Sequence, residues 1–474
     1  MQVSCSSKDI CWREYEPCTV LYDLRTRQIL TLENVAADIW RKVASERACD
    51  LDDIIEHVAE EYDCDFDDVA DDVCAFVEEL YLMGVVLLDG GYNEPEAPSE
   101  GYASPDDDIE GEIIRSLEPF DQLYSATFEM TYACNESCVH CYAHFPGAMQ
   151  AHRAIDYKGY RKAIDELREM GCMHLAFTGG DPFMHRDFPD VFFYARERGF
   201  VCDVYTNGLY LYDNDELLER MADARPRAFF ISLYGSKADV HDSVTCKPGS
   251  FDKTIHVVKR LRELGVPVVL NVMLLSINHF DLPNIICLAK DFGVEYRASM
   301  SLIMRNDGSD KPMDYFIGDK AAIKTAISAI RDNFFSIDVS ASEFERTEYI
   351  CGAGVTSISI DPGGQIHPCI SLKSVLGSID AGTIRAAWKS PARSAVMESL
   401  RWDNTNECMA CKSRDFCPHC PGMSQAESGN IFACNTCDKI VSECIMEIDS
   451  CYWKGDHHGI VWPLQEQGQR RHRG

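Results

Sequence analysis

The sequence predicts an α/β protein with several domains, built around a parallel sheet that is open or partly closed as a barrel. Its 474 residues are enough for two to four domains. Strand and helix patterns alternate six times in the middle of the chain. Thirteen of the 23 cysteines gather in two places, with three between residues 134 and 141 and ten between residues 351 and 451. These observations predict an N-terminal domain, a central sheet and a cysteine-rich C-terminal region.

Residues 1–90 are predicted to form a small winged helix-turn-helix domain. Two strand patterns precede three amphipathic helical patterns and a closing strand, at 19–24, 28–32, 34–44, 51–62, 66–83 and 85–88. Gly84 is expected to end the third helix. Domains of this fold often bind DNA. Here the third helix, DFDDVADDVCAFVEEL, would repel phosphates, and the formal charge of −32 argues against any nucleic-acid partner.

The central region is predicted to be the main α/β unit. It follows residues 91–115, where Gly, Pro, Ser, Asp and Glu without apolar periodicity predict a flexible acidic linker. Within residues 116–340 the strand patterns are 125–132, 174–178, 201–206, 228–234, 267–274 and 295–300, separated by amphipathic helical stretches. Six such units in a row predict a parallel sheet, and active sites in such folds lie at the C-terminal ends of the strands.

The location of the chain bears on the role of its cysteines. No run of about 18 apolar residues occurs, and no basic segment precedes an apolar one at the N-terminus. We therefore expect no membrane span and no secretory signal, and we place the protein in the cytoplasm. Disulfides are rare there, so the clustered cysteines are interpreted as ligands of metals or iron–sulfur clusters. Residues 341–455 are expected to be held together by such ligands, and residues 456–474 to form a tail.

Cys134, Cys138 and Cys141 lie in the segment CNESCVHC, directly after the first central strand. Three thiolates at this spacing can hold three irons of a [4Fe–4S] cube and leave the fourth iron without a protein ligand. An open iron can chelate S-adenosylmethionine (SAM) and reduce its sulfonium, which releases a 5′-deoxyadenosyl radical. The alternative is a structural zinc site, for which His140 or His144 would have to supply a further ligand.

This segment resembles the signature CxxxCxΦC of the radical SAM superfamily, with His140 at the aromatic position that usually lies by the adenine. The resemblance implies a partial (β/α)6 TIM barrel, with Cys134, Cys138 and Cys141 as the catalytic residues. The implied SAM contacts are Gly179, Gly180, Asp181 and Pro182 at the methionine amino group, Thr206 and Asn207 at the ribose, Ser232 near the methionine carboxylate, and Asn271 as a weaker candidate. Asp181 stands where the family usually has Glu. Read alone, GGDP and TNG predict only turns, but their places after successive strands favour the SAM interpretation.

The C-terminal cysteines are similar to the SPASM extension of radical SAM enzymes that modify peptides and proteins. That extension normally holds two auxiliary [4Fe–4S] clusters, so the resemblance implies three clusters in all. The first auxiliary cluster would take Cys351, Cys369 and Cys420, and the second Cys408, Cys411, Cys417 and either Cys434 or Cys437. Ser357 stands where the family often has another Cys, which would leave an open iron in the first auxiliary cluster. Paired zinc ribbons are the alternative, because CxxC pairs alone do not exclude zinc.

The N-terminal domain resembles the peptide chaperone of pyrroloquinoline quinone biosynthesis. The same fold is the recognition element of many enzymes that mature ribosomal peptides. In that family the leader of the precursor peptide adds as a strand beside the sheet and packs on the third helix. The resemblance therefore implies a precursor peptide, bound through its leader, as the partner of residues 1–90.

Together these resemblances identify the chain as a radical SAM/SPASM maturase of ribosomally made peptides. We expect it to abstract a hydrogen from the core of a precursor peptide and to install a crosslink, with a Cys thioether as the first choice. Carbon–carbon or carbon–oxygen crosslinking, epimerisation, and oxidation of a folded protein or small molecule are the alternatives, and a cluster-bearing redox regulator is a remote one. A flavodoxin- or ferredoxin-like protein is expected as the reductant. No nucleic-acid or membrane partner is expected.

Overall fold

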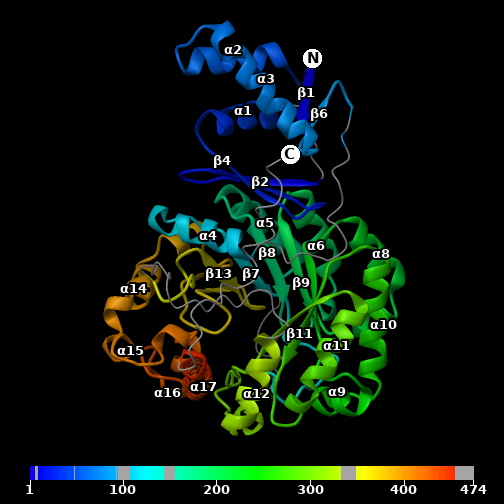
Figure 1. Ribbon diagram of the computed structural model, residues 1–474, viewed down its shortest axis with the longest axis vertical. Coiled ribbons are helices and arrows are strands. Elements are labelled where there is room, and N and C mark those ends of the chain that lie inside the picture. The colour runs from blue at the N-terminus through cyan, green and yellow to red at the C-terminus, as the bar shows by residue number, and fades with distance from the viewer. Residues whose placement is uncertain are drawn as a thin grey trace.

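The computed structural model describes residues 1–5, 9–46, 48–91, 93, 107–143, 155–331 and 349–453. Most of the predicted linker, the whole predicted tail and His144 lie outside these residues. Figure 1 shows a helical N-terminal domain above one end of an open barrel, with the cysteine-rich region beside the barrel's first strands. Within the described ranges no helix is both long enough and apolar enough to cross a bilayer.

The N-terminal domain contains every strand and helix that its sequence predicts. The predicted hairpin is β3 (Thr19–Asp23) and β4 (Ile29–Leu32), the helices are α1 (Asn34–Ser45), α2 (Leu51–Glu61) and α3 (Phe66–Leu82), and the closing strand is β6 (Val86–Leu88). Three strands were not predicted: β1 (Gln2–Cys5), β2 (Ile10–Glu14) and β5 (Cys49–Asp50). They complete two small sheets, β2-β3-β4 and β5-β1-β6. The helices pack around Trp40, which is completely buried.

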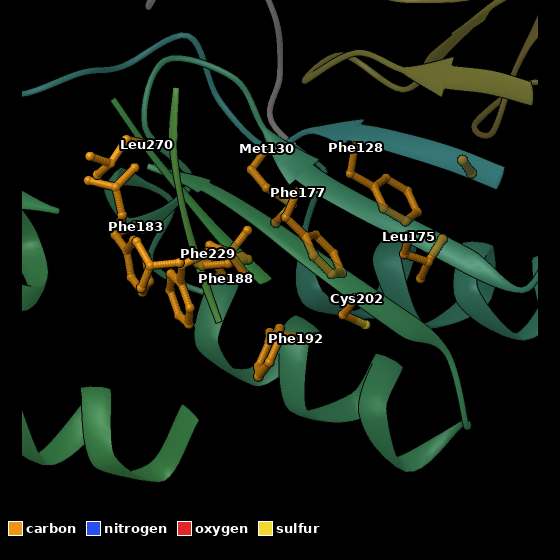
Figure 2. Packing of buried hydrophobic residues seen from close by; sticks show 14 of the residues in the cluster. Phe128, Met130, Leu175, Phe177, Phe183, Phe188, Phe192, Cys202, Phe229 and Leu270 are labelled. Atoms are coloured by element: carbon orange, nitrogen blue, oxygen red, sulfur yellow. The ribbon is translucent and has the colours of Figure 1, made fainter. Parts of the chain in front are cut away.

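The central barrel is built from six consecutive parallel strands. They are β7 (Ser125–Glu129), β8 (His174–Thr178), β9 (Val201–Thr206), β10 (Ala228–Ser232), β11 (Val268–Met273) and β12 (Glu295–Ser299). The associated helices are α5 (Tyr157–Glu169), α6 (Phe188–Glu197), α7 (Leu209–Tyr212), α8 (Asp215–Asp223), α9 (Ala238–Thr245), α10 (Ser250–Glu263), α11 (Leu282–Phe292) and α12 (Lys320–Arg331). Alternate strand residues such as Phe128, Phe177 and Phe229 pack against these helices (Figure 2), so the residues between them line the concave face.

The sheet extends past β7 into the C-terminal region. Strand β13 (Ser357–Ile360) pairs in parallel with β7, and β14 (Gln365–His367) and β15 (Gly377–Ser378) follow as antiparallel strands. The remaining helices are α13 (Ile384–Trp388), α14 (Pro391–Ser399), α15 (Asn406–Met409), α16 (Pro421–Ser428) and α17 (Thr436–Trp453). Because the strand order runs from β12 to β15 without closing, the barrel is partial, as predicted.

The N-terminal domain docks on the N-terminal ends of the barrel strands. The buried guanidinium of Arg13 on β2 donates from Nε to the carbonyl of Cys172 at 2.7 Å and lies 4.8 Å from the ring centre of Phe200. The hydroxyl of Tyr15 donates to the carbonyl of Gly171 at 2.8 Å. Cys172 lies just before the start of β8, and Phe200 directly precedes the first residue of β9. The cysteine segment 134–141 lies at the opposite ends of the strands.

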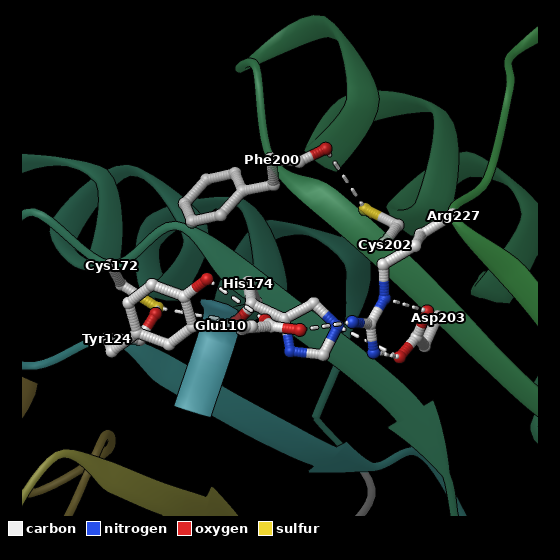
Figure 3. Close-up of polar contacts among 8 residues, drawn as sticks. All are labelled: Glu110, Tyr124, Cys172, His174, Phe200, Cys202, Asp203 and Arg227. Atoms are coloured by element: carbon white, nitrogen blue, oxygen red, sulfur yellow. Dashed lines mark hydrogen bonds and ion pairs between the residues drawn. The ribbon is translucent and has the colours of Figure 1, made fainter. Parts of the chain in front are cut away.

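A buried ion-pair network closes the same end of the barrel (Figure 3). Arg227 pairs with Asp203, and with Glu110 of helix α4 (Asp107–Leu117) at 2.6 Å. His174 lies 3.0 Å from Asp203, and the hydroxyl of Tyr124 donates to Glu110 at 2.9 Å. Burial by itself would raise the pKa of Asp203, but Arg227 and His174 hold that pKa well below its usual range. The carboxylate of Asp203 is therefore charged and paired inside the protein.

Candidate active site

The three cysteines of the segment 134–141 lie together on the loop that leaves β7. The thiols of Cys134 and Cys141 both raise the pKa of Cys138, and Cys141 also raises that of Cys134, although burial is the largest cause and raises the pKa of Cys134 to about 12. The N–H groups of Ser137 and Val139 in this loop donate hydrogen bonds to backbone carbonyls at the end of α9, both at 3.0 Å. The fold thus presents three adjacent thiols at the C-terminal end of the sheet.

The glycines of GGDP bring the loop after β8 against the cysteine loop. Gly179 has a φ of +133°, and a Cβ there would overlap the carbonyl oxygen of Thr131. A Cβ on Gly180 would overlap the carbonyl oxygen of Ala133. The N–H of Gly180 donates to Thr131 at 2.6 Å. The close backbone approach that requires glycine here is therefore made to the cysteine loop itself.

Asp181 ties this loop to the end of β9. Its carboxylate is completely buried and accepts hydrogen bonds from the N–H of Phe183 at 3.0 Å, the hydroxyl of Thr206 at 2.7 Å and the N–H of Asn207 at 3.0 Å. Burial raises the pKa of Asp181, and these three donors oppose that rise. The side chain of Asp181 thus joins the loop after β8 to the end of β9 by hydrogen bonds.

Asn207 joins the end of β9 to the cysteine loop. Its side-chain amide donates to Oδ1 of Asn135 at 2.6 Å and to the sulfur of Cys134 at 3.7 Å. Its Oδ1 accepts from the N–H of Leu209 at 3.0 Å, which fixes which end of the amide faces the sulfur. Three successive strand ends, those of β7, β8 and β9, are therefore linked around the three thiols.

His140 and Ser232 both contact Tyr234, a residue that the sequence interpretation missed. The ring centres of His140 and Tyr234 are 4.8 Å apart, and Ser232 is a hydrogen-bond partner of the Tyr234 side chain. Burial lowers the pKa of His140 to about 4, so its ring is neutral, and its Nδ1 is a buried atom without a hydrogen-bond partner among the described residues. Asn271 is next to Ser232 in register on β11 and is exposed toward the concave face.

These residues fit a SAM-binding iron–sulfur cluster. Three thiols are the donor set that iron–sulfur clusters require, an amide faces one of them, and a buried ring nitrogen is left for a bound molecule. Among the described residues, no three or more His, Cys, Asp or Glu side chains are arranged to hold a single metal ion. A cluster bound by Cys134, Cys138 and Cys141 would supply an electron to the sulfonium of SAM.

The C-terminal cysteines form two groups. Cys351, Cys369 and Cys420 are mutually close, since the pKa of Cys351 is raised first by burial and then by the other two thiolates. In the second group burial is again the largest cause, and in addition Cys417 and Cys411 raise the pKa of Cys408, Cys434 raises that of Cys417, and Cys408 and Cys411 raise that of Cys434. Cys437 is completely buried in an apolar cluster with Leu302, whose carbonyl is 4.0 Å from its sulfur, and Cys420 of the first group packs against the same cluster.

Comparisons with known proteins agree with this arrangement. Residues 128–286 match the radical SAM superfamily, residues 18–86 match coenzyme PQQ synthesis protein D (PqqD), and residues 351–421 match the SPASM iron–sulfur cluster-binding domain. Two relatives are each 24% identical to the chain: the AdoMet-dependent heme synthase of Methanosarcina barkeri and the subtilosin biosynthesis protein AlbA of Bacillus subtilis. The first match covers 64% of this chain and 92% of the relative, and the second 62% and 64%.

The fold is shared with a solved structure. Streptococcus suis SuiB bound to precursor peptide SuiA superposes with a TM-score of 0.63 and 14% identity, over 93% of this chain and all of that one. The three matches cover the cysteine loop, the helical N-terminal domain and the auxiliary cysteines from Cys351 to Cys420, while Cys434 lies beyond them. The radical SAM and SPASM domains bind SAM and [4Fe–4S] clusters. This chain is a radical SAM enzyme with an N-terminal PqqD-like domain and a C-terminal SPASM domain.

Proposed function

We propose that this enzyme removes a hydrogen atom from the core of a ribosomally made precursor peptide and installs a crosslink there, formed from a Cys thiol as a thioether. The proposal is supported by the functions of similar proteins. AlbA takes part in the biosynthesis of the bacteriocin subtilosin, and SuiB has been solved with its precursor peptide. Leader binding by the N-terminal domain and an external flavodoxin- or ferredoxin-like reductant belong to the same proposal.

The observation that carries the proposal is the edge strand of the PqqD-like domain. Strand β4 lies at the end of the sheet β2-β3-β4, paired with β3 on one side only in the described part of the chain. Such an edge can take up an extended peptide through its free backbone groups. Helix α3 is acidic, with Asp67, Asp68, Asp71 and Asp72 exposed in its first two turns. This charge favours a leader that contains basic residues.

The thioether is favoured by the group Cys351, Cys369 and Cys420. A cube held by three thiolates keeps one iron for another ligand, and a substrate thiolate is a suitable one. Ser357, at the position where related domains often have a further Cys, donates its hydroxyl to the carbonyl of Gly352 at 2.9 Å. The hydroxyl of Ser357 is therefore hydrogen-bonded to the backbone, and this group keeps three thiols as its cluster ligands.

A second function is favoured by the similarity to the heme synthase, whose whole length is almost covered by the match. That similarity supports chemistry on a small molecule. The PqqD-like match at residues 18–86 distinguishes the two proposals, since a small molecule would not need an edge strand for its recognition. The enzyme acting on a peptide should therefore lose turnover when β4 can no longer pair.

The test is co-expression of the enzyme with a Cys-containing precursor peptide, followed by mass spectrometry of the purified peptide. A thioether removes two hydrogen atoms and makes one cysteine resistant to alkylation by iodoacetamide. A carbon–carbon or carbon–oxygen crosslink gives the same mass loss with every cysteine alkylated, and epimerisation in D₂O adds deuterium instead. The enzyme with Cys134, Cys138 and Cys141 replaced by Ala is the control. An unmodified peptide with the active enzyme and a functional reductant would contradict the proposal.

A further inference from the structure

A buried carboxylate lies between the catalytic cysteine loop and the first auxiliary group. Glu129, the last residue of β7, is completely buried at the C-terminal end of the sheet. It accepts hydrogen bonds from the hydroxyls of Tyr132 at 3.3 Å and Tyr142 at 3.1 Å. The two tyrosines flank the segment that contains Cys134, Cys138 and Cys141. Glu129 is thus fixed from the catalytic side by two side chains.

The third partner of Glu129 comes from the C-terminal region. The ammonium of Lys373 lies 2.9 Å from Oε2 of Glu129, across 244 positions of sequence. Lys373 follows Cys369 by four residues, and the N–H of Leu372 between them donates to the sulfur of Cys369 at 3.2 Å. The ion pair between Glu129 and Lys373 therefore connects the loop of the catalytic cysteines to the loop that contains Cys369.

Lys373 lies in the same loop as Cys369, whose sulfur accepts a hydrogen bond from the backbone of that loop. A positive charge fixed in this loop favours added negative charge on a cluster bound there. Without Glu129, the flexible side chain of Lys373 would have no buried anchor and would spread over several rotamers.

We propose that Lys373, held in place by Glu129, is a positioning residue that raises the reduction potential of the cluster bound by Cys351, Cys369 and Cys420. Reduction adds one negative charge to a cluster, and a nearby fixed cation stabilises the reduced form. The inference rests on the cluster-binding SPASM domain and is independent of the proposed peptide substrate.

The experiment compares Lys373→Met with Lys373→Arg in full-length protein that also has Cys134, Cys138 and Cys141 replaced by Ala. This background leaves the two auxiliary clusters, about eight iron atoms, as the only titrating centres. Each reconstituted protein is titrated with a mediator series, and the reduced clusters are followed by electron paramagnetic resonance. We expect the Met variant to shift one of the two midpoint potentials to a more negative value. The Arg variant should keep it near the parent value.

A matched control removes the same charge elsewhere. Lys389→Met changes an exposed lysine at the C-terminal end of α13 and should move neither potential. Iron content shows that both clusters are present in every protein compared, and Lys373→Gln replaces the Met variant if that one loads poorly. Unchanged potentials in the loaded Met or Gln variant would overturn the inference. So would an Arg variant that shifts as far as the Met variant, because packing and not charge would then be responsible.

Discussion

Replacing Asp181 by Asn is expected to weaken SAM binding about ten- to hundredfold, because a loss of 1.4 kcal/mol corresponds to a factor of ten. The carboxylate accepts three hydrogen bonds in a completely buried position. In its better orientation, the amide oxygen of Asn would keep the bonds from Thr206 and Asn207. Its NH₂ group would then face the N–H of Phe183, donor against donor. Losing one hydrogen bond to a charged group and leaving a buried donor unsatisfied costs about 1.5–3 kcal/mol.

The assay for Asp181→Asn is equilibrium binding of SAM to the anaerobically reconstituted enzyme. Iron content and a circular-dichroism melt on the same preparation separate a local effect from loss of the cluster or the fold. Asp223→Asn, which makes the same change at an exposed position in α8, is the control and should bind SAM normally. If Asp181→Asn holds its full iron and binds SAM as tightly as the parent enzyme, the carboxylate does not hold the SAM loops in place.

Three further outcomes are expected. Replacing Cys134, Cys138 and Cys141 together by Ala should remove about four of about twelve irons, and any 5′-deoxyadenosine detected by chromatography would refute the assignment. Cys434→Ala should likewise cost about four irons, whereas Cys437→Ala should cost none in the same iron assay. Arg227→Met removes the guanidinium from the buried Asp203, leaving His174 as its remaining partner, and should lower the urea-unfolding free energy by about 3–5 kcal/mol. Because the folded pKa of Asp203 is lowered, this difference should hold at neutral pH and shrink only below the ordinary Asp pKa of about 3.9.

The six barrel strands could be predicted from sequence because each is a local apolar run between helical patterns. Strand β8, for example, begins and ends where the sequence predicts. Strand β13 was missed because its sequence, SISI, is short and half polar. Its partner β7 lies more than 200 residues earlier, and only that pairing makes Ser357–Ile360 a strand. The same holds for β1, which is completed by β6 at the other end of its domain.

Within the site, motifs predicted which residues gather but not how they interact. The choice between Cys434 and Cys437 could not be made from spacing, because both precede or begin the same helix, α17. The structure places Cys434 with Cys408 and buries Cys437 among apolar side chains. Glu129 and Lys373 carry no motif at all, and no local pattern relates residues so far apart in the chain.

For a precursor peptide bound through its leader, as proposed above, the docking of the N-terminal domain would set a minimum length. Arg13 and Tyr15 fix that domain to the start of the barrel strands, and the cysteine loop follows their ends. A strand of six residues such as β9 spans about 20 Å, at roughly 3.3 Å per residue. If the leader is held on β4, the chain must run at least this far before its first modifiable residue reaches the radical. The length of the barrel strands would then set the shortest distance between the bound leader and the radical. Residues that follow the leader too closely would not reach the radical and would stay unmodified.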